Sequence, residues 1–158
     1  MMFAAFLERR LVRPIIALLR QGITPEKIAM CLALGVVLGI FPVIGATTFL
    51  CALAALFLKL NLPAIQLVNY LVYPLQLALL LPFFRAGEWL FDAEPLPLSI
   101  REILRMFDRS AWEAILLLWD TTLHAIIVWC LAAPFIVLSL YLIFKQVLAR
   151  LHVKTLTD

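Results

Sequence analysis

Residues 28–58 include no charged side chain, and this run constrains the fold more than any other feature of the sequence. As one straight helix it would be about 46 Å long, against a hydrocarbon core of about 30 Å in a bilayer. Its centre, GIFPVIGATTF (residues 39–49), is rich in glycine, proline and threonine, which disfavour a continuous helix. A break at residues 42–45 leaves two arms of about 20 Å, each too short to cross comfortably. We therefore predict over residues 25–59 a broken-helix hairpin that enters the membrane, turns inside it and returns.

The composition favours a membrane protein. Of the 158 residues, 65% are hydrophobic and 15% are charged, and the mean hydropathy is +1.07. A soluble domain is about half apolar and about a quarter charged, so a soluble fold of this size would have to bury nearly every apolar residue. We predict a single all-α integral membrane domain over residues 1–158.

The charged residues are distributed as a bilayer would require. Basic residues flank the apolar region, whereas residues 86–98 carry acids and no base. By the positive-inside rule, this multi-pass chain would have both termini in the cytoplasm and its acidic middle outside. The net charge of +3 is then no evidence for nucleic-acid binding. We expect no cleavable signal, because arginines precede any long apolar run. The basic residues are Arg9, Arg10, Arg13, Arg20 and Lys27 on one side and Lys145, Arg150 and Lys154 on the other.

The first segment, residues 1–24, is amphipathic, with apolar side chains on one helical face and arginines on the other. This pattern predicts a helix lying in the membrane surface; a helix packed on the protein itself would show it too. Thr24 is a suitable N-cap and Pro25 a suitable first residue for the next helix, which we expect to begin at about residue 25.

A second uncharged run lies within residues 60–85 and carries Pro74 near its centre. We predict a proline-broken membrane segment, which is either one kinked span or a second hairpin. Residues 86–110 predict an acidic, proline-rich loop and then a short amphipathic helix opened by a capping box of Ser99 and Glu102.

Residues 111–151 predict a long helix, opened by a second capping box of Ser110 and Glu113. Within it, residues 125–144 carry no charge and have the length of one membrane span. Pro134 is expected to bend the helix.

The break in the first run is the best candidate site. A helix that begins inside the membrane presents backbone N–H groups and partial positive charge, an arrangement that favours anions. We expect Gly45, Thr47 and Thr48 to bind a phosphate or carboxylate, with the threonines capping the second helix. Alternatively, the threonines only satisfy the turn, and Gly35 and Gly39 allow close helix packing.

The second run carries a stripe of polar side chains at helical spacing, which is unlikely to face lipid. These residues are expected either to line a substrate path or to hydrogen-bond between helices. They are Gln66, Asn69, Tyr70, Tyr73 and Gln76.

Asp120 and His124 lie one turn apart on the last helix and could share a hydrogen bond and relay protons. Trp112 and Trp119 place this region at the outer interface, where both residues would instead be ordinary solvent-facing groups.

Other chemistry is not indicated. The sequence has no nucleophile elbow, phosphate-binding loop or zinc-protease motif, and no metal centre, cofactor or catalytic residue is predicted. The three cysteines lie singly in apolar stretches, so we expect neither disulfides nor a zinc site.

The run from F-P-x-x-G-x-x-T through L-x-L-P-A to a proline-broken, asparagine-containing segment resembles a bacterial membrane family, domain of unknown function 2062. The resemblance covers roughly residues 14–90 and would place the protein in the bacterial inner membrane. Many members have an adjacent Asn-Pro pair, whereas Asn69 and Pro74 are separated here, which indicates a subgroup. Association of some members with glycosyltransferase-like domains implies envelope or lipid-linked sugar metabolism. Its matching residues are Phe41, Pro42, Gly45, Thr48, Asn61, Pro63, Ala64, Asn69 and Pro74.

Together these features favour a non-enzymatic membrane protein that transports or flips an anionic amphiphile, such as a lipid phosphate. With so few spans, it would form homo-oligomers or join a partner membrane enzyme. The main alternative is a non-catalytic scaffold for an envelope or lipid-linked biosynthetic enzyme. A third is an integral membrane enzyme that uses Asp120 and His124.

Overall fold

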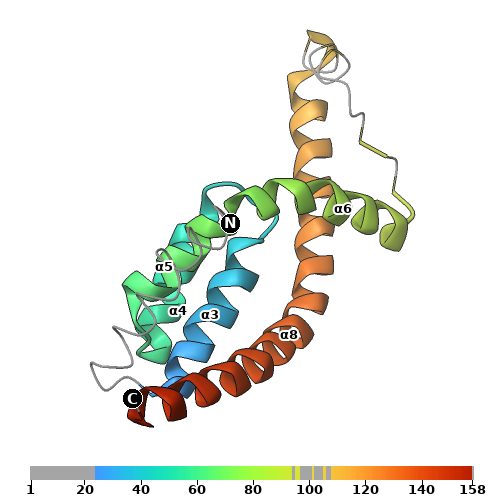
Figure 1. Ribbon diagram of the computed structural model, residues 1–158. Coiled ribbons are helices and arrows are strands. Elements are labelled where there is room, and N and C mark those ends of the chain that lie inside the picture. Colours follow the sequence, from blue (N-terminus) through green and yellow to red (C-terminus); the bar gives the residue numbers. More distant parts are fainter. Residues whose placement is uncertain (1–23, 94, 97–100, 102–104, 106–107, 158) are drawn as a thin grey trace.

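The computed structural model describes residues 24–93, 95–96, 101, 105 and 108–157. Within these residues the chain forms helices and no strand, so the all-α prediction is confirmed (Figure 1). The interfacial helix predicted over residues 1–24 lies outside the described part, apart from Thr24, and so does the capping box of Ser99 and Glu102.

The first apolar run folds as two helices, α3 (Pro25–Gly39) and α4 (Ala46–Leu58). Thr24 caps α3 by accepting a hydrogen bond from Lys27 N, and Pro25 occupies the first turn, where its missing N–H costs nothing. Gly45 has a φ of 89°, which glycine adopts without the strain of a Cβ. The chain therefore reverses at the predicted break, and α4 returns alongside α3 (Figure 1).

The second apolar run forms α5 (Leu62–Leu71) and α6 (Tyr73–Phe91), whose axes differ in direction by 63°. Pro74 has no N–H to continue the helix, so the chain breaks at Val72. The predicted break at the proline is thus observed as a 63° bend between the two helices. The loop expected from residue 86 is wrong at its start, because α6 continues to Phe91 with Gly87 packed against another helix.

The last helix, α8 (Ala111–Thr157), begins where Ser110 Oγ accepts a hydrogen bond from Glu113 N, as the sequence predicts. It packs against both α6 and α3 and contains Pro134. In the described residues it is the one continuous helix that is long and apolar enough to cross a membrane. The bent pair α5 and α6 qualifies as a second only if both helices count as one span.

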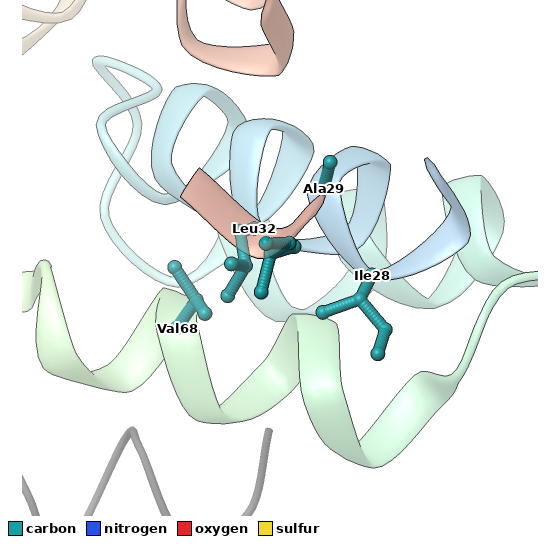
Figure 2. Close-up of a cluster of buried hydrophobic side chains, with 5 residues drawn as sticks. Ile28, Ala29, Leu32 and Val68 are labelled. Carbon is teal, nitrogen blue, oxygen red and sulfur yellow. The ribbon is translucent and has the colours of Figure 1, made fainter. Parts of the chain in front are cut away.

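The core is small and centred on α3. One cluster joins α3, α5 and α8 through Ile28, Ala29, Leu32, Val68 and Leu148, four of which are labelled in Figure 2. A second cluster joins α4 and α5 through Cys51, Ala55 and Ile65. The predicted close packing at the glycines is observed: a Cβ on Gly35 would lie 2.7 Å from Val68 Cβ. Small residues on α3 thus bring α5 within backbone distance.

Candidate functional site

Polar side chains from α5 and α6 gather on the turn between α3 and α4. Gln76 is 1% exposed, and its Nε2 donates to Phe41 O at 2.8 Å and to Val43 O at 3.4 Å. A helix end leaves carbonyls without intrahelical partners, and burying such groups unpaired is costly. Gln76 therefore supplies the hydrogen bonds that the break at Pro42 requires.

Two more amides connect α5 to the first turn of α4. Gln66 Nε2 donates to Thr48 O at 2.8 Å. Asn69, which is 3% exposed, donates through Nδ2 to Gln66 Oε1 at 3.1 Å and, at the long distance of 3.5 Å, to Thr48 Oγ1. We call these side chains of Thr48, Gln66, Asn69 and Gln76 the turn network.

One atom of the turn network has no hydrogen-bond partner among the described residues: the buried Gln76 Oε1. Since Nε2 of the same amide faces two carbonyls, the assignment of oxygen and nitrogen is fixed by the bonding. The turn network therefore presents a free acceptor, which suits a hydroxyl or amine donor.

Trp129 on α8 contacts the turn between α3 and α4 from the opposite side. Its Nε1 donates to Val37 O at 3.1 Å, and its ring meets Phe41 edge-on with centroids 4.9 Å apart. This role of Trp129 was not predicted from the sequence. The signal that could have indicated it is that an indole N–H in an apolar helix needs a hydrogen-bond acceptor.

The predicted anion-binding residues lie at the start of α4, but their roles differ from those expected. Gly45 is itself the N-cap, and no side chain caps the helix. The expected capping by Thr47 and Thr48 is wrong, because the left-handed Gly45 starts the helix before them and places them within its first turn. Thr47 is 6% exposed, whereas Thr48 and Gly45 are exposed.

The polar stripe of the second run is divided. Gln66, Asn69 and Gln76 point to the turn, whereas Tyr70 and Tyr73 are 63% and 46% exposed. The expectation that all five share one face is wrong: Tyr70 lies about 100° around α5 from Asn69, on an exposed face, and Tyr73 starts α6 beyond the bend. The tyrosines therefore do not belong to the turn network.

The predicted pair of Asp120 and His124 does not form. Among the hydrogen bonds of the described side chains, none joins the two residues. His124 instead stacks on Phe91, with ring centroids 4.3 Å apart, and Asp120 is exposed. Gly87 lies against the backbone of α8 at His124, so α6 comes close enough for this stacking.

Glu88 is a buried acidic residue of α6, whereas the sequence predicted it in an outer loop. It is 6% exposed, pairs with Arg85 at 2.7 Å and accepts a hydrogen bond from Leu96 N at 2.7 Å. The spacing of Arg85 and Glu88, three residues apart, was the available helical signal. The pair fixes the end of α6 and the chain that follows it.

An apolar groove of about 450 Å³ runs between α3 and α8. Near the turn its wall contains Val37, Leu38 and Trp129, and at its other end Met30 and Tyr141. Over the described residues, no group of three His, Cys, Asp or Glu side chains could hold a metal ion. One end of the apolar groove, at Trp129, thus lies next to the polar turn.

Comparison with known proteins identifies the family. No curated protein and no solved structure matches the chain. A family profile described as "Uncharacterized protein conserved in bacteria (DUF2062)" matches residues 8–156, nearly the whole chain. The chain therefore belongs to this bacterial family, as the residues around the Pro42 break suggested.

Proposed function

We propose that this protein is a multi-pass protein of the bacterial inner membrane that binds an anionic amphiphile, such as a lipid phosphate, and moves it across the bilayer. The observation that carries the proposal is that Trp129 belongs both to the wall of the apolar groove and to the contacts of the turn. Trp129 lines the groove, bonds to Val37 O and packs on Phe41, whose carbonyl accepts from Gln76.

In this proposal the two parts of the ligand occupy different surroundings. The hydrocarbon chain lies in the apolar groove, and the anionic group approaches the exposed start of α4 at Gly45 and Thr48. Backbone N–H groups of a first helical turn favour an anion.

Exposed apolar side chains support residence in the membrane. The outer face of α4 carries Phe49, Leu56 and Phe57, each at least 65% exposed, and the turn network on its inner side contains no charge. Large apolar patches of this kind face lipid or a partner protein. The hairpin of α3 and α4 would then turn within the bilayer, with both termini in the cytoplasm as the basic residues favour.

The test is lipid movement in proteoliposomes. Protein reconstituted with a fluorescent phosphatidic acid is exposed to an external quencher, and the rate at which inner-leaflet lipid becomes quenched is measured. The double change Thr47→Val and Thr48→Val should lower the protein-dependent rate by about tenfold, the effect of removing hydrogen bonds to a charged group. A matched control, Thr121→Val with Thr122→Val on α8, should leave the rate unchanged.

A non-catalytic scaffold for a membrane enzyme is the second candidate. It is favoured by the fact that Gln66, Asn69 and Gln76 each donate to the protein itself, as amides that only hold the turn would do. It predicts that the double threonine variant retains activity in cells.

Water access to the turn separates the two candidates. After replacement of the three native cysteines, a cysteine at Val43 or Ala46 is treated with a water-soluble thiol reagent. The transport proposal predicts labelling at both positions, whereas complete protection would favour a sealed packing turn.

A further inference from the structure

We propose a second binding mode for lipid in the same apolar groove, in the reverse orientation: at the opposite end of α3 the groove opens into a basic pocket that holds the phosphate of an anionic glycerophospholipid. The proposal requires that the protein resides in a bilayer, as proposed above, but not that the turn binds a ligand. It assigns a partner to side chains that the turn network does not use.

The basic pocket has a volume of about 270 Å³ and lies between the start of α3, the end of α4 and α8. Its walls are both charged and apolar. Glu26 and Lys27 come from α3, Leu58 and Leu60 flank the end of α4, and Met30 and Tyr141 complete it. Met30 and Tyr141 also line the apolar groove, so the two cavities adjoin.

The rim of the pocket suits a phosphate. Lys27 lines it, and Lys145 reaches it through a loose ion pair with Glu26, with Nζ 3.8 Å from Oε1. Both partners of that pair are about half exposed, so the pair contributes little and Lys145 is free to turn to another anion. The charged groups at this end of the apolar groove are thus Lys27 and Glu26 in the wall of the pocket and Lys145 paired with Glu26, two positive charges and one negative.

The length of the groove fits one leaflet. From Met30 to Leu38 the α3 wall extends about 12 Å, against roughly 15 Å for half of the hydrocarbon core. An acyl chain in the groove would therefore run from the basic pocket toward the turn, with its phosphate at the membrane surface. Such a surface position also explains why lysines are tolerated here, whereas the turn network is built from uncharged amides.

The proposal is tested by quenching of Trp129, which lines the groove. In a full-length variant with Trp89, Trp112 and Trp119 changed to Phe, Trp129 is the only tryptophan and all three replaced residues are exposed. The protein is reconstituted in bilayers that contain brominated phosphatidylglycerol or brominated phosphatidylcholine. We expect phosphatidylglycerol to associate more tightly by at least about fivefold, the usual effect of one lysine on an anionic lipid.

Paired variants separate a specific pocket from general surface charge. Lys27→Gln with Lys145→Gln should abolish the preference. Lys59→Gln with Arg150→Gln removes the same charge from the same end, at residues that neither line the pocket nor pair with Glu26, and should leave most of the preference. Equal losses in the two double variants would overturn the proposal, and so would equal quenching by the two lipids in the parent.

A separate pair of variants tests whether the groove binds the acyl chain of the lipid. Leu138→Phe fills the groove at an exposed position and should weaken quenching by both lipids, whereas Leu142→Phe, one turn away and outside the groove, should not. Glycerol 3-phosphate without acyl chains should not reduce the preference. If it does, the pocket is a site for free phosphate esters and the lipid proposal is wrong.

These outcomes are distinct from those of the transport proposal. The double threonine change at the turn should leave the phosphatidylglycerol preference intact. If neither brominated lipid quenches Trp129, both proposals fail together, because the groove would not face lipid.

Discussion

The two ends of α3 manage polar groups in opposite ways. At the end near Gly39, uncharged amides are buried and bonded to backbone carbonyls, as in the contact of Gln76 with Phe41 O. At the end near Pro25, charged side chains are exposed and loosely paired, as in the contact of Glu26 with Lys145. Burying an uncharged amide costs far less than burying a charge, so uncharged amides are found at the buried end of α3 and charged groups at the exposed end.

The packing of neighbouring helices also differs between the two ends of α3. Gly35 and Gly39 bring α5 against α3 near the turn, whereas a pocket opens between α3, α4 and α8 near Pro25. Changes near the turn should therefore cost stability, and changes at the basic end should mainly alter what the surface binds. In each prediction below, the measured quantity is the free energy of unfolding. The protein is unfolded by detergent titration in mixed micelles, and circular dichroism monitors the unfolding.

The largest loss is expected for Gln76→Leu, at about 3 kcal/mol, because Phe41 O loses its donor at 2.8 Å and Val43 O keeps only the long bond from Ala46 N at 3.4 Å. Gln66→Leu is the matched control. Its side chain is only partly buried and its partner Thr48 O belongs to a helix, but its Oε1 also accepts from the buried Asn69, so about 1 to 2 kcal/mol is expected. Equal losses in the two variants would contradict the special role given to Gln76.

Gly39→Ala should cost about 2 kcal/mol by overpacking. The new Cβ would overlap Val72 Cγ2 and lie 3.2 Å from Asn69 Oδ1, so it presses on the turn network as well as on α5. Gly45→Ala provides the comparison, since its Cβ would meet open space and only the left-handed backbone is strained, at about 1 kcal/mol. A smaller loss at Gly39 than at Gly45 would show that the helix contact is loose.

At the other end of α3, Thr24→Ala removes the N-cap and should cost about 0.5 to 1 kcal/mol. The bond from Lys27 N is 3.4 Å long and exposed, which favours the lower part of this range. Thr24→Ser keeps the hydroxyl and should restore the stability of the parent. No recovery with serine would show that the threonine acts through its methyl group.

The smallest effect is expected for Lys145→Gln, at about 0.5 kcal/mol or less, because exposed ion pairs contribute little. Glu26→Gln should match it, and added salt should erase both losses. A loss above about 1 kcal/mol would mean that Lys145 holds α8 to α3, and the contrast between the two ends would fail.

Much of the fold was predictable because helix ends depend on neighbouring residues. Thr24 and Pro25 start α3, Ser110 starts α8, and the proline and glycine of the first run break it where expected. The site was predictable only in part. Gln66, Asn69 and Gln76 meet the turn, but the exposure of Tyr70 and Tyr73 depends on which faces of α5 and α6 the neighbouring helices cover.

The sequence by itself determined that the described chain is helical, where its helices start and break, and that charge is excluded from residues 28–58. These properties follow from hydrogen bonding and steric limits within about one helical turn. Only the tertiary structure decided that Gln76 reaches Phe41, that Trp129 contacts the turn, and that the apolar groove adjoins the basic pocket. Such contacts join residues far apart in the chain, and they depend on the angles and close approaches at which whole helices pack.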